Sequence, residues 1–201
     1  GNADIENRDV QNEIIEHSED MFMDVAKHTN GAVAYYLRFS PEISDDKTGF
    51  FYSKPEGSGE YIKLEATDLA LYEKDDREHV GWFWEPYDAG EPIWMKPYHN
   101  QNNDMWIISY VIPMYYEDKF IGVVGMDFDY VVLTDLVHEI ELYENGFAHL
   151  EMNGEMICDD VHEVGEETRK VRINNIHYVY DNNYPNGWSQ LSFFKGWLYF
   201  A

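Results

Sequence analysis

Two long apolar segments joined by a short polar turn constrain the fold of this chain more than any other feature. Residues 105–115 and 120–128 are rich in Ile, Val, Tyr and Phe, with Glu117, Asp118 and Lys119 at the turn between them. β-Branched and aromatic residues favour half-buried strands, and a short polar turn joins antiparallel neighbours. The pair predicts a long central hairpin, and therefore a fold organised around an antiparallel sheet.

Further strands and two helices are predicted on either side of this hairpin. From Gly146 the strand pattern begins again, which predicts a second, smaller module. The expected elements before that point are helix 9–29, strands 32–39, 49–53 and 61–64, and an amphipathic helix at 130–142. The apolar stripe expected on the first helix consists of Val10, Ile14, Met21, Phe22 and Val25.

Residues 66–104 contain many aromatic side chains but show no clean period. Pro86, Gly90, Pro92 and Pro97 interrupt the segment. An irregular stretch of this length inside a domain is usually functional. Short helices and loops, folded over one face of the sheet, are therefore expected here.

The charge balance excludes one class of partner. The chain carries 39 acidic and 14 basic residues, a formal net charge of -25, and a field of that sign repels nucleic-acid phosphates and anionic membrane surfaces. Nucleic-acid binding is therefore not expected.

The single cysteine, Cys158, cannot form a disulfide within the chain. No apolar run reaches the ~18 residues of a membrane span, so membrane attachment is expected only through segments outside this chain.

No pattern in this sequence is specific for catalysis or for metal binding. The eight histidines are scattered, and the acidic loop at 44–46 lacks the ligand spacing of an EF-hand. No metal and no cofactor is therefore expected.

Asp127 and Asp129 end the second hairpin strand, and two carboxylates facing a pocket can hydrolyse glycosidic bonds. Gly122 and Gly125 in the same strand predict a bulge or a close backbone approach.

Three segments in the middle of the chain together resemble the double-Cache sensor domains, whose modules are PAS-like. The likeness covers about residues 31–150 and rests on the order and spacing of the segments. The segments are Trp82-Phe83-Trp84-Glu85-Pro86 with Ala89-Gly90-Glu91-Pro92-Ile93-Trp94, then Pro97-Tyr98 with Ile108-Ser109-Tyr110-Val111-Ile112-Pro113, and then Phe120-Ile121-Gly122-Val123-Val124-Gly125-Met126-Asp127-Phe128.

The resemblance implies an α+β fold with a PAS-like antiparallel sheet behind a long N-terminal helix. Residues 1–30 would be the signalling helix, 31–142 the membrane-distal, ligand-binding Cache module, and 143–201 a smaller membrane-proximal module whose completeness the sequence leaves open. It also implies a place on the extracellular face of a bacterial membrane, in a receptor with a histidine kinase, diguanylate cyclase or chemotaxis transducer as output. This part of the receptor would bind a ligand rather than catalyse a reaction. The oligomeric state, including a homodimer of the full-length receptor, stays open.

The resemblance further implies a ligand site in the distal module. In amino-acid-binding members, an aromatic pair, a Tyr after a Pro and an Asp at a strand end line this site. Aromatic walls would enclose a small molecule, and the carboxylate would hold an ammonium group. The matching positions here are Trp82, Phe83, Tyr98 and Asp127. The full set of predicted ligand-binding residues is Trp82, Phe83, Trp94, Tyr98, Asn100, Tyr110 and Asp127.

Two positions depart from the amino-acid-binding pattern. Those members carry an Arg two residues before the Trp, where this chain has Val80, and an acidic residue two after the Tyr, where it has Asn100. Without the guanidinium, the bidentate grip on a ligand carboxylate is lost. An amine or another small polar metabolite is therefore expected, with Arg77 as an alternative source of a guanidinium.

Two other functions stay open at this point. One is a secreted hydrolase that uses Asp127 with a second carboxylate. The other is a sensor whose pocket has degenerated and which serves as a dimerisation scaffold, with Trp82 as a core residue. Asp127 also has an alternative local role as the N-cap of the following helix, for which Asp129 is better placed.

Overall fold

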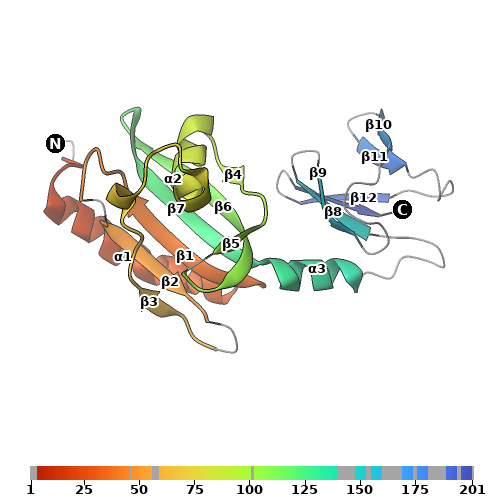
Figure 1. Cartoon of the computed structure of the whole chain (residues 1–201), viewed down its shortest axis with the longest axis horizontal. Helices are drawn as coiled ribbons and strands as arrows, with labels where there is room; N and C mark the ends of the chain where they lie inside the picture. Colours follow the sequence, from red (N-terminus) through yellow and green to blue (C-terminus); the bar gives the residue numbers. More distant parts are fainter. Residues whose placement is uncertain are drawn as a thin grey trace. The chain divides into compact units, whose positions relative to one another are not determined.

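The computed structural model describes residues 4–45, 47–55, 59–100, 102–139, 148–152, 155–159, 169–173, 176–180, 189–193 and 196–200. The chain divides into two units, Gly1–Asp129 and Tyr130–Ala201, each with strands of its own (Figure 1). The predicted α+β class, with a helix followed by an antiparallel sheet, is confirmed.

The first unit is built on one seven-stranded sheet. Its strand order is β3-β2-β1-β7-β6-β4, with β5 also paired to β6. The first and last strands of the unit's sequence, β1 and β7, therefore lie together at the centre, and every pair is antiparallel. The elements are α1 (Arg8–Lys27), β1 (Ala32–Phe39), β2 (Gly49–Ser53), β3 (Ile62–Leu64), the 3-10 helix η1 (Leu69–Leu71), α2 (Arg77–Ala89), β4 (Ile93–Trp94), β5 (Tyr98–Asn100), β6 (Met105–Tyr116) and β7 (Lys119–Asp129).

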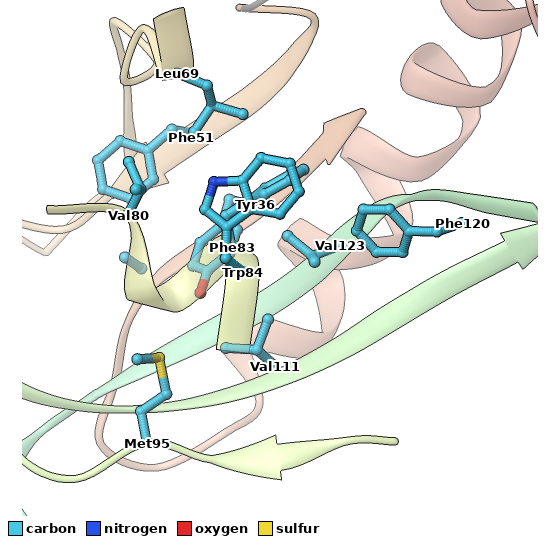
Figure 2. Close-up of a cluster of buried hydrophobic side chains, with 11 residues drawn as sticks. Tyr36, Phe51, Leu69, Val80, Phe83, Trp84, Met95, Val111, Phe120 and Val123 are labelled. Atoms are coloured by element: carbon cyan, nitrogen blue, oxygen red, sulfur yellow. The ribbon is translucent and has the colours of Figure 1, made fainter. Parts of the chain in front are cut away.

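Side chains alternate between the two faces of this sheet, and a helix covers each face (Figure 1). On β1, Tyr35 and Leu37 pack with residues of α1 in one core cluster. Ala34 and Tyr36 belong to the other cluster, which includes Phe83 of α2 and is drawn in Figure 2. All eight residues of β1 are buried, as expected for a central strand covered on both sides.

Helix α1 begins at a local cap and contacts the sheet through a stripe rotated from the predicted one. The Asn7 side chain accepts a hydrogen bond from the backbone N–H of Asp9, which satisfies one of the free amides of the first turn. Met21 and Val25, predicted on the apolar stripe, are 59% and 52% exposed. Ile14 and Phe22 of the predicted stripe do pack against the sheet, and Ile15, Met23 and Ala26 join them there.

The segment 66–104 is more regular than its sequence indicates. It contains one helix of 13 residues, α2, and two short strands that extend the sheet. Asp76 caps the start of α2, and Gly90, with φ of 67°, ends it in the left-handed conformation. The sequence shows no helical period here because buried residues lie on more than one side of α2, Val80 and Phe83 among them. Pro86 inside the helix also argues against a helix in the sequence.

The central hairpin of β6 and β7 forms as predicted, and a glycine in β7 lets it approach β1. Glu117 and Asp118 have φ of 47° and 63°, the backbone that a two-residue hairpin turn requires. Gly122 has φ of 148°, and a Cβ atom built there would lie 2.1 Å from the carbonyl oxygen of Arg38. The predicted close backbone approach is therefore confirmed, since any side chain at this position would collide with β1.

The second unit contains helix α3 and six short strands in the described segments. Tyr130 donates a hydrogen bond from its hydroxyl to the carbonyl of Ile157 at 2.8 Å, which ties α3 to β9. Strands β12, β13, β8 and β9 form one antiparallel sheet in that order, and β10 and β11 form a separate pair. The bounds are α3 (Tyr130–His138), β8 (Ala148–Met152), β9 (Glu155–Asp159), β10 (Arg169–Ile173), β11 (Ile176–Tyr180), β12 (Ser189–Phe193) and β13 (Gly196–Phe200).

Replacing Gly122 with alanine tests the β1–β7 contact. We expect Gly122→Ala to lower the free energy of unfolding by more than about 2 kcal/mol, because the methyl group adds both a backbone clash and a strained φ. Gly59→Ala is the matched control, since a Cβ at Gly59 meets nothing within 4 Å. Urea unfolding of both variants measures the difference, and equal stabilities would contradict the packing described for Gly122.

Candidate ligand-binding site

Four small or polar residues lie side by side across the face of the sheet that α2 covers. Strand register places Ser53 of β2 opposite Ala34 of β1, Ala34 opposite Asp127 of β7, and Asp127 opposite Ser109 of β6. Residues opposite each other in an antiparallel pair share a face. All four are at most 1% exposed. A carboxylate and two hydroxyls are thus held in a row beneath α2, with the methyl group of Ala34 between them.

The Asp127 carboxylate has a hydrogen bond on one oxygen only. The Ser109 hydroxyl donates to Oδ1 at 2.7 Å, and the Tyr98 hydroxyl lies 2.9 Å from Ser109 Oγ. Because Ser109 has a single proton, Tyr98 must donate to Ser109 in this chain of bonds. Oδ2 is buried and has no hydrogen-bond partner. Burial raises the pKa of Asp127 to about 7, and the Ser109 hydrogen bond opposes that rise.

Tyr36 stands in the next row of the same face and leans over a glycine. A Cβ atom at Gly125 would lie 2.2 Å from the Tyr36 ring, so only glycine admits this position of the ring. Burial, followed by the Asp127 charge, holds the pKa of Tyr36 well above its usual value. Its hydroxyl approaches Ser109 without a hydrogen bond of ordinary geometry. The edge of the Trp82 indole meets the Tyr36 ring at 5.2 Å between centroids, and its Nε1 donates to the carbonyl of His79.

Of the predicted ligand-binding residues, the structure brings Tyr98, Trp82 and Asp127 to one face and separates three others from the carboxylate. Phe83 is fully buried in the apolar cluster of Figure 2, where its ring contacts those of Trp84 and Phe120. Phe120 lies seven residues before Asp127, near the hairpin turn of β7. This is a position in the hydrophobic core.

Trp94 and Tyr110 lie on the opposite face of the sheet from Asp127. They pair with each other across β4 and β6. Their rings are 4.9 Å apart, and the Trp94 ring lies 5.4 Å from that of Phe128. Because side chains alternate along a strand, residues 110 and 128 cannot share the face of residues 109 and 127.

Asn100 is buried, and its side chain stabilises the turn that follows it. Its Oδ1 accepts a hydrogen bond from the backbone N–H of Asn102 at 2.9 Å. Asn103, which the sequence did not indicate, reaches the Asp127 face: its Nδ2 donates to Ser53 Oγ at 3.1 Å, and its Oδ1 is buried with no hydrogen-bond partner.

Arg38 was also missed, although an arginine inside the apolar strand 32–39 is an available signal. It is 2% exposed on the same face of β1 as Tyr36, and its guanidinium lies 5.9 Å from the centre of the Trp82 ring. Val80, at the position of the family's carboxylate-binding arginine, is fully buried in the core. Arg77 forms an ion pair with Asp88 at 2.7 Å near the surface.

Within the described part of the chain, no group of three or more His, Cys, Asp or Glu side chains is arranged to hold a metal ion. No helix within these segments combines the length and apolar character needed to cross a bilayer.

Comparison with known proteins yields one family match and several structural likenesses. The model of the methyl-accepting chemotaxis protein-like first PDC sensor domain matches residues 18–135. No curated protein matches the chain in sequence.

Solved structures with a similar fold are sensor domains of two receptor types. The extracellular domains of the proteins named as histidine kinases mmHK1S-Z2 and mmHK1S-Z3 align with TM-scores of 0.61 and 0.59 at 12% and 13% identity, over 98% of this chain and 83% and 80% of theirs. The ligand-binding domain of the Campylobacter jejuni chemoreceptor Tlp3 in complex with L-valine aligns with a TM-score of 0.50 at 14% identity, over 98% of this chain and 80% of that one.

Replacing Asp127 with asparagine tests its burial. A folded-state pKa raised above the ordinary 3.8 means that ionisation of Asp127 lowers stability as pH rises toward 7. We expect Asp127→Asn to be more stable than the wild type by about 2–4 kcal/mol at a pH of about 8, with the gap closing near a pH of about 4. Urea unfolding across this range measures it.

Asp118→Asn is the control for this experiment, because it removes the same charge from an exposed turn. Its stability relative to the wild type should change little between those two pH values. A gap for Asp127→Asn that stays constant with pH would mean that the carboxylate is solvated in the folded state.

Proposed function

The chain belongs to the methyl-accepting chemotaxis protein-like family of first PDC sensor domains, and we propose that it senses a small amine on the outer face of a bacterial membrane. It would do so as the ligand-binding part of a transmembrane receptor. The fold relatives described as extracellular domains of receptors support this location. The output domain would be a histidine kinase, a chemotaxis transducer or a diguanylate cyclase.

The observation that carries the proposal is the buried Asp127 carboxylate with one oxygen lacking a hydrogen bond. Burying an ionised carboxylate without a full set of partners is costly, whereas a charge-assisted hydrogen bond to an ammonium group offsets that cost. Tyr98 and Ser109 fix the orientation of the carboxylate through the other oxygen. The Trp82 and Tyr36 rings supply aromatic surface for the organic part of the ligand.

The arginine pattern favours an amine over an α-amino acid. The family's carboxylate-gripping position is Val80 in this chain, and Arg77 is engaged with Asp88. Tlp3 is described in complex with L-valine, so valine is the appropriate comparison ligand. If Arg38 took the place of the missing arginine, valine would bind better than the amine that lacks its carboxylate.

Signalling would follow from a difference in affinity between two conformations of the receptor. Helix α2 covers the Asp127 face, and α1 covers the other face of the same sheet. A ligand that holds α2 closer to the sheet would alter the sheet's packing on α1. Helix α1 would then pass the change toward the membrane.

Two other functions remain as competing hypotheses. A hydrolase needs a second carboxylate within about 5–10 Å of the first. Glu85 is a described residue that could supply it, because its charge, like that of Asp127, raises the pKa of Tyr98. The pKa of Asp127 itself is set by burial and the Ser109 hydrogen bond. A degenerate sensor, acting as a scaffold, would bind no small molecule at Asp127.

Calorimetric titration with isobutylamine and L-valine, which share an isobutyl body, tests the proposal. We expect isobutylamine to bind more tightly, and Asp127→Asn to weaken it by at least about tenfold, because the charge-assisted hydrogen bond is lost. Binding should also strengthen about tenfold as the pH rises from about 6 to about 8, since Asp127 ionises near pH 7.

Asp118→Asn should leave the isobutylamine affinity unchanged. Tighter binding of L-valine than of isobutylamine would replace the amine with an α-amino acid as the ligand class. Absence of binding by a broad panel of amines, amino acids and sugars would favour the scaffold, and sugar hydrolysis that depends on Asp127 would favour the enzyme.

A further inference from the structure

We propose that Asn103 is a ligand-binding residue and that the site selects a primary ammonium group by its three N–H donors. This inference rests on the proposed amine function and specifies the chemistry of its ligand. It is carried by three buried acceptor atoms without hydrogen bonds: Asp127 Oδ2, Tyr36 Oη and Asn103 Oδ1.

The Asn103 amide is oriented by a bond that uses its donor side. Nδ2 donates to Ser53 Oγ at 3.1 Å, so Oδ1 must face away from that hydroxyl. Ser53 in turn donates to the carbonyl of Val33 at 3.4 Å, which holds its hydroxyl in place. The hydrogen bond to Ser53 therefore fixes the orientation of the Asn103 amide, with its oxygen directed away from Ser53 on the α2 face of the sheet.

Asn103 and Asp127 reach this face from opposite sides of Ala34. Ser53, Ala34 and Asp127 occupy the same level on three adjacent strands, and Asn103 is bonded to Ser53. Strands lie about 4.8 Å apart, so Ser53 and Asp127 are separated by about 10 Å across Ala34. An ammonium group bound on this face would lie between the two side chains and could donate to both oxygens.

The third acceptor, Tyr36 Oη, comes from the next row of the same face. Tyr36 follows Ala34 on the same face of β1, one row along, and its hydroxyl is near enough to Asp127 for that charge to raise the Tyr36 pKa, after burial. Three acceptors from three segments thus lie on the α2 face of the sheet, near Ala34. A primary ammonium offers three N–H groups in a tetrahedral arrangement, whereas a quaternary ammonium offers none.

Aromatic surface alone would predict the opposite preference. Trp82 and Tyr36 present ring surface to this region, and such surfaces bind quaternary ammonium groups well. The three acceptors without hydrogen bonds favour a primary over a quaternary ammonium ligand, because a quaternary ammonium would leave all three buried without partners. The number of N–H groups, rather than charge alone, should therefore control affinity.

A series with constant charge and body tests this inference. The probes are isobutylamine, its N-methyl and N,N-dimethyl derivatives, and trimethyl(isobutyl)ammonium, titrated against the intact chain by calorimetry. We expect each lost N–H to weaken binding, with about a hundredfold difference between the ends of the series. Asn103→Leu should weaken isobutylamine about tenfold and leave the trimethyl compound unchanged.

Three variants separate a ligand contact from a structural role. Asn103→Asp keeps an acceptor and adds a charge, so it should bind isobutylamine at least as tightly as the wild type. Ser53→Ala releases the amide and should cause an intermediate loss. Asn102→Ala, at the exposed neighbouring asparagine, should change nothing.

The outcomes distinguish this inference from the proposed function. If isobutylamine binds in an Asp127-dependent way, but the trimethyl compound binds equally well and Asn103→Leu has no effect, Asn103 is not a ligand residue and the amine function stands. Loss of binding in both Asn103→Leu and Asn103→Asp would assign Asn103 a structural role. If no amine binds the wild type, both proposals fail.

Discussion

The pairing of β1 with β7 is the constraint on which the rest of this structure depends. It joins the two ends of the first unit at the centre of the sheet, and the absence of side chains at Gly122 and Gly125 permits the close contact. The register also decides which residues face α2. A slip of one residue would turn Asp127 toward α1 and place Met126 or Phe128 beneath α2. Core packing and site chemistry are therefore fixed by the same set of backbone hydrogen bonds.

The site is assembled at some expense to the stability of the domain. One oxygen of a buried carboxylate, a tyrosine hydroxyl and an amide oxygen each lack a hydrogen bond, while the surrounding clusters of apolar and aromatic side chains supply the compensating stabilisation. Buried ionisable groups with strongly shifted pKa values concentrate at functional sites, and Asp127 is such a group. Their common position on one face of one sheet gives the proposal its physical basis.

Local patterns in the sequence predicted much of the fold, whereas the arrangement of the site depends on contacts between distant segments. The β6–β7 hairpin and strands β1 and β2 follow from composition and turns. Asp127 was identified by its place at the end of an apolar strand. Trp94 lies on the short edge strand β4, whose face the sequence order does not reveal, and Tyr110 lies next to Ser109 on β6 and therefore on the opposite face. Asn103 could not be identified, since its role depends on a hydrogen bond to Ser53, fifty positions earlier in the chain.

Ala34 has a consequence for how receptors of this fold diversify. Its methyl group is the side chain that β1 contributes between Ser53 and Asp127. Exchanging it for glycine, serine or valine would change the size or the polarity of the side chain at this point without altering any charged group. In the proposed site, the room for a ligand and the charge that meets it would thus be set at separate positions. A lineage can change one while retaining the other through single substitutions.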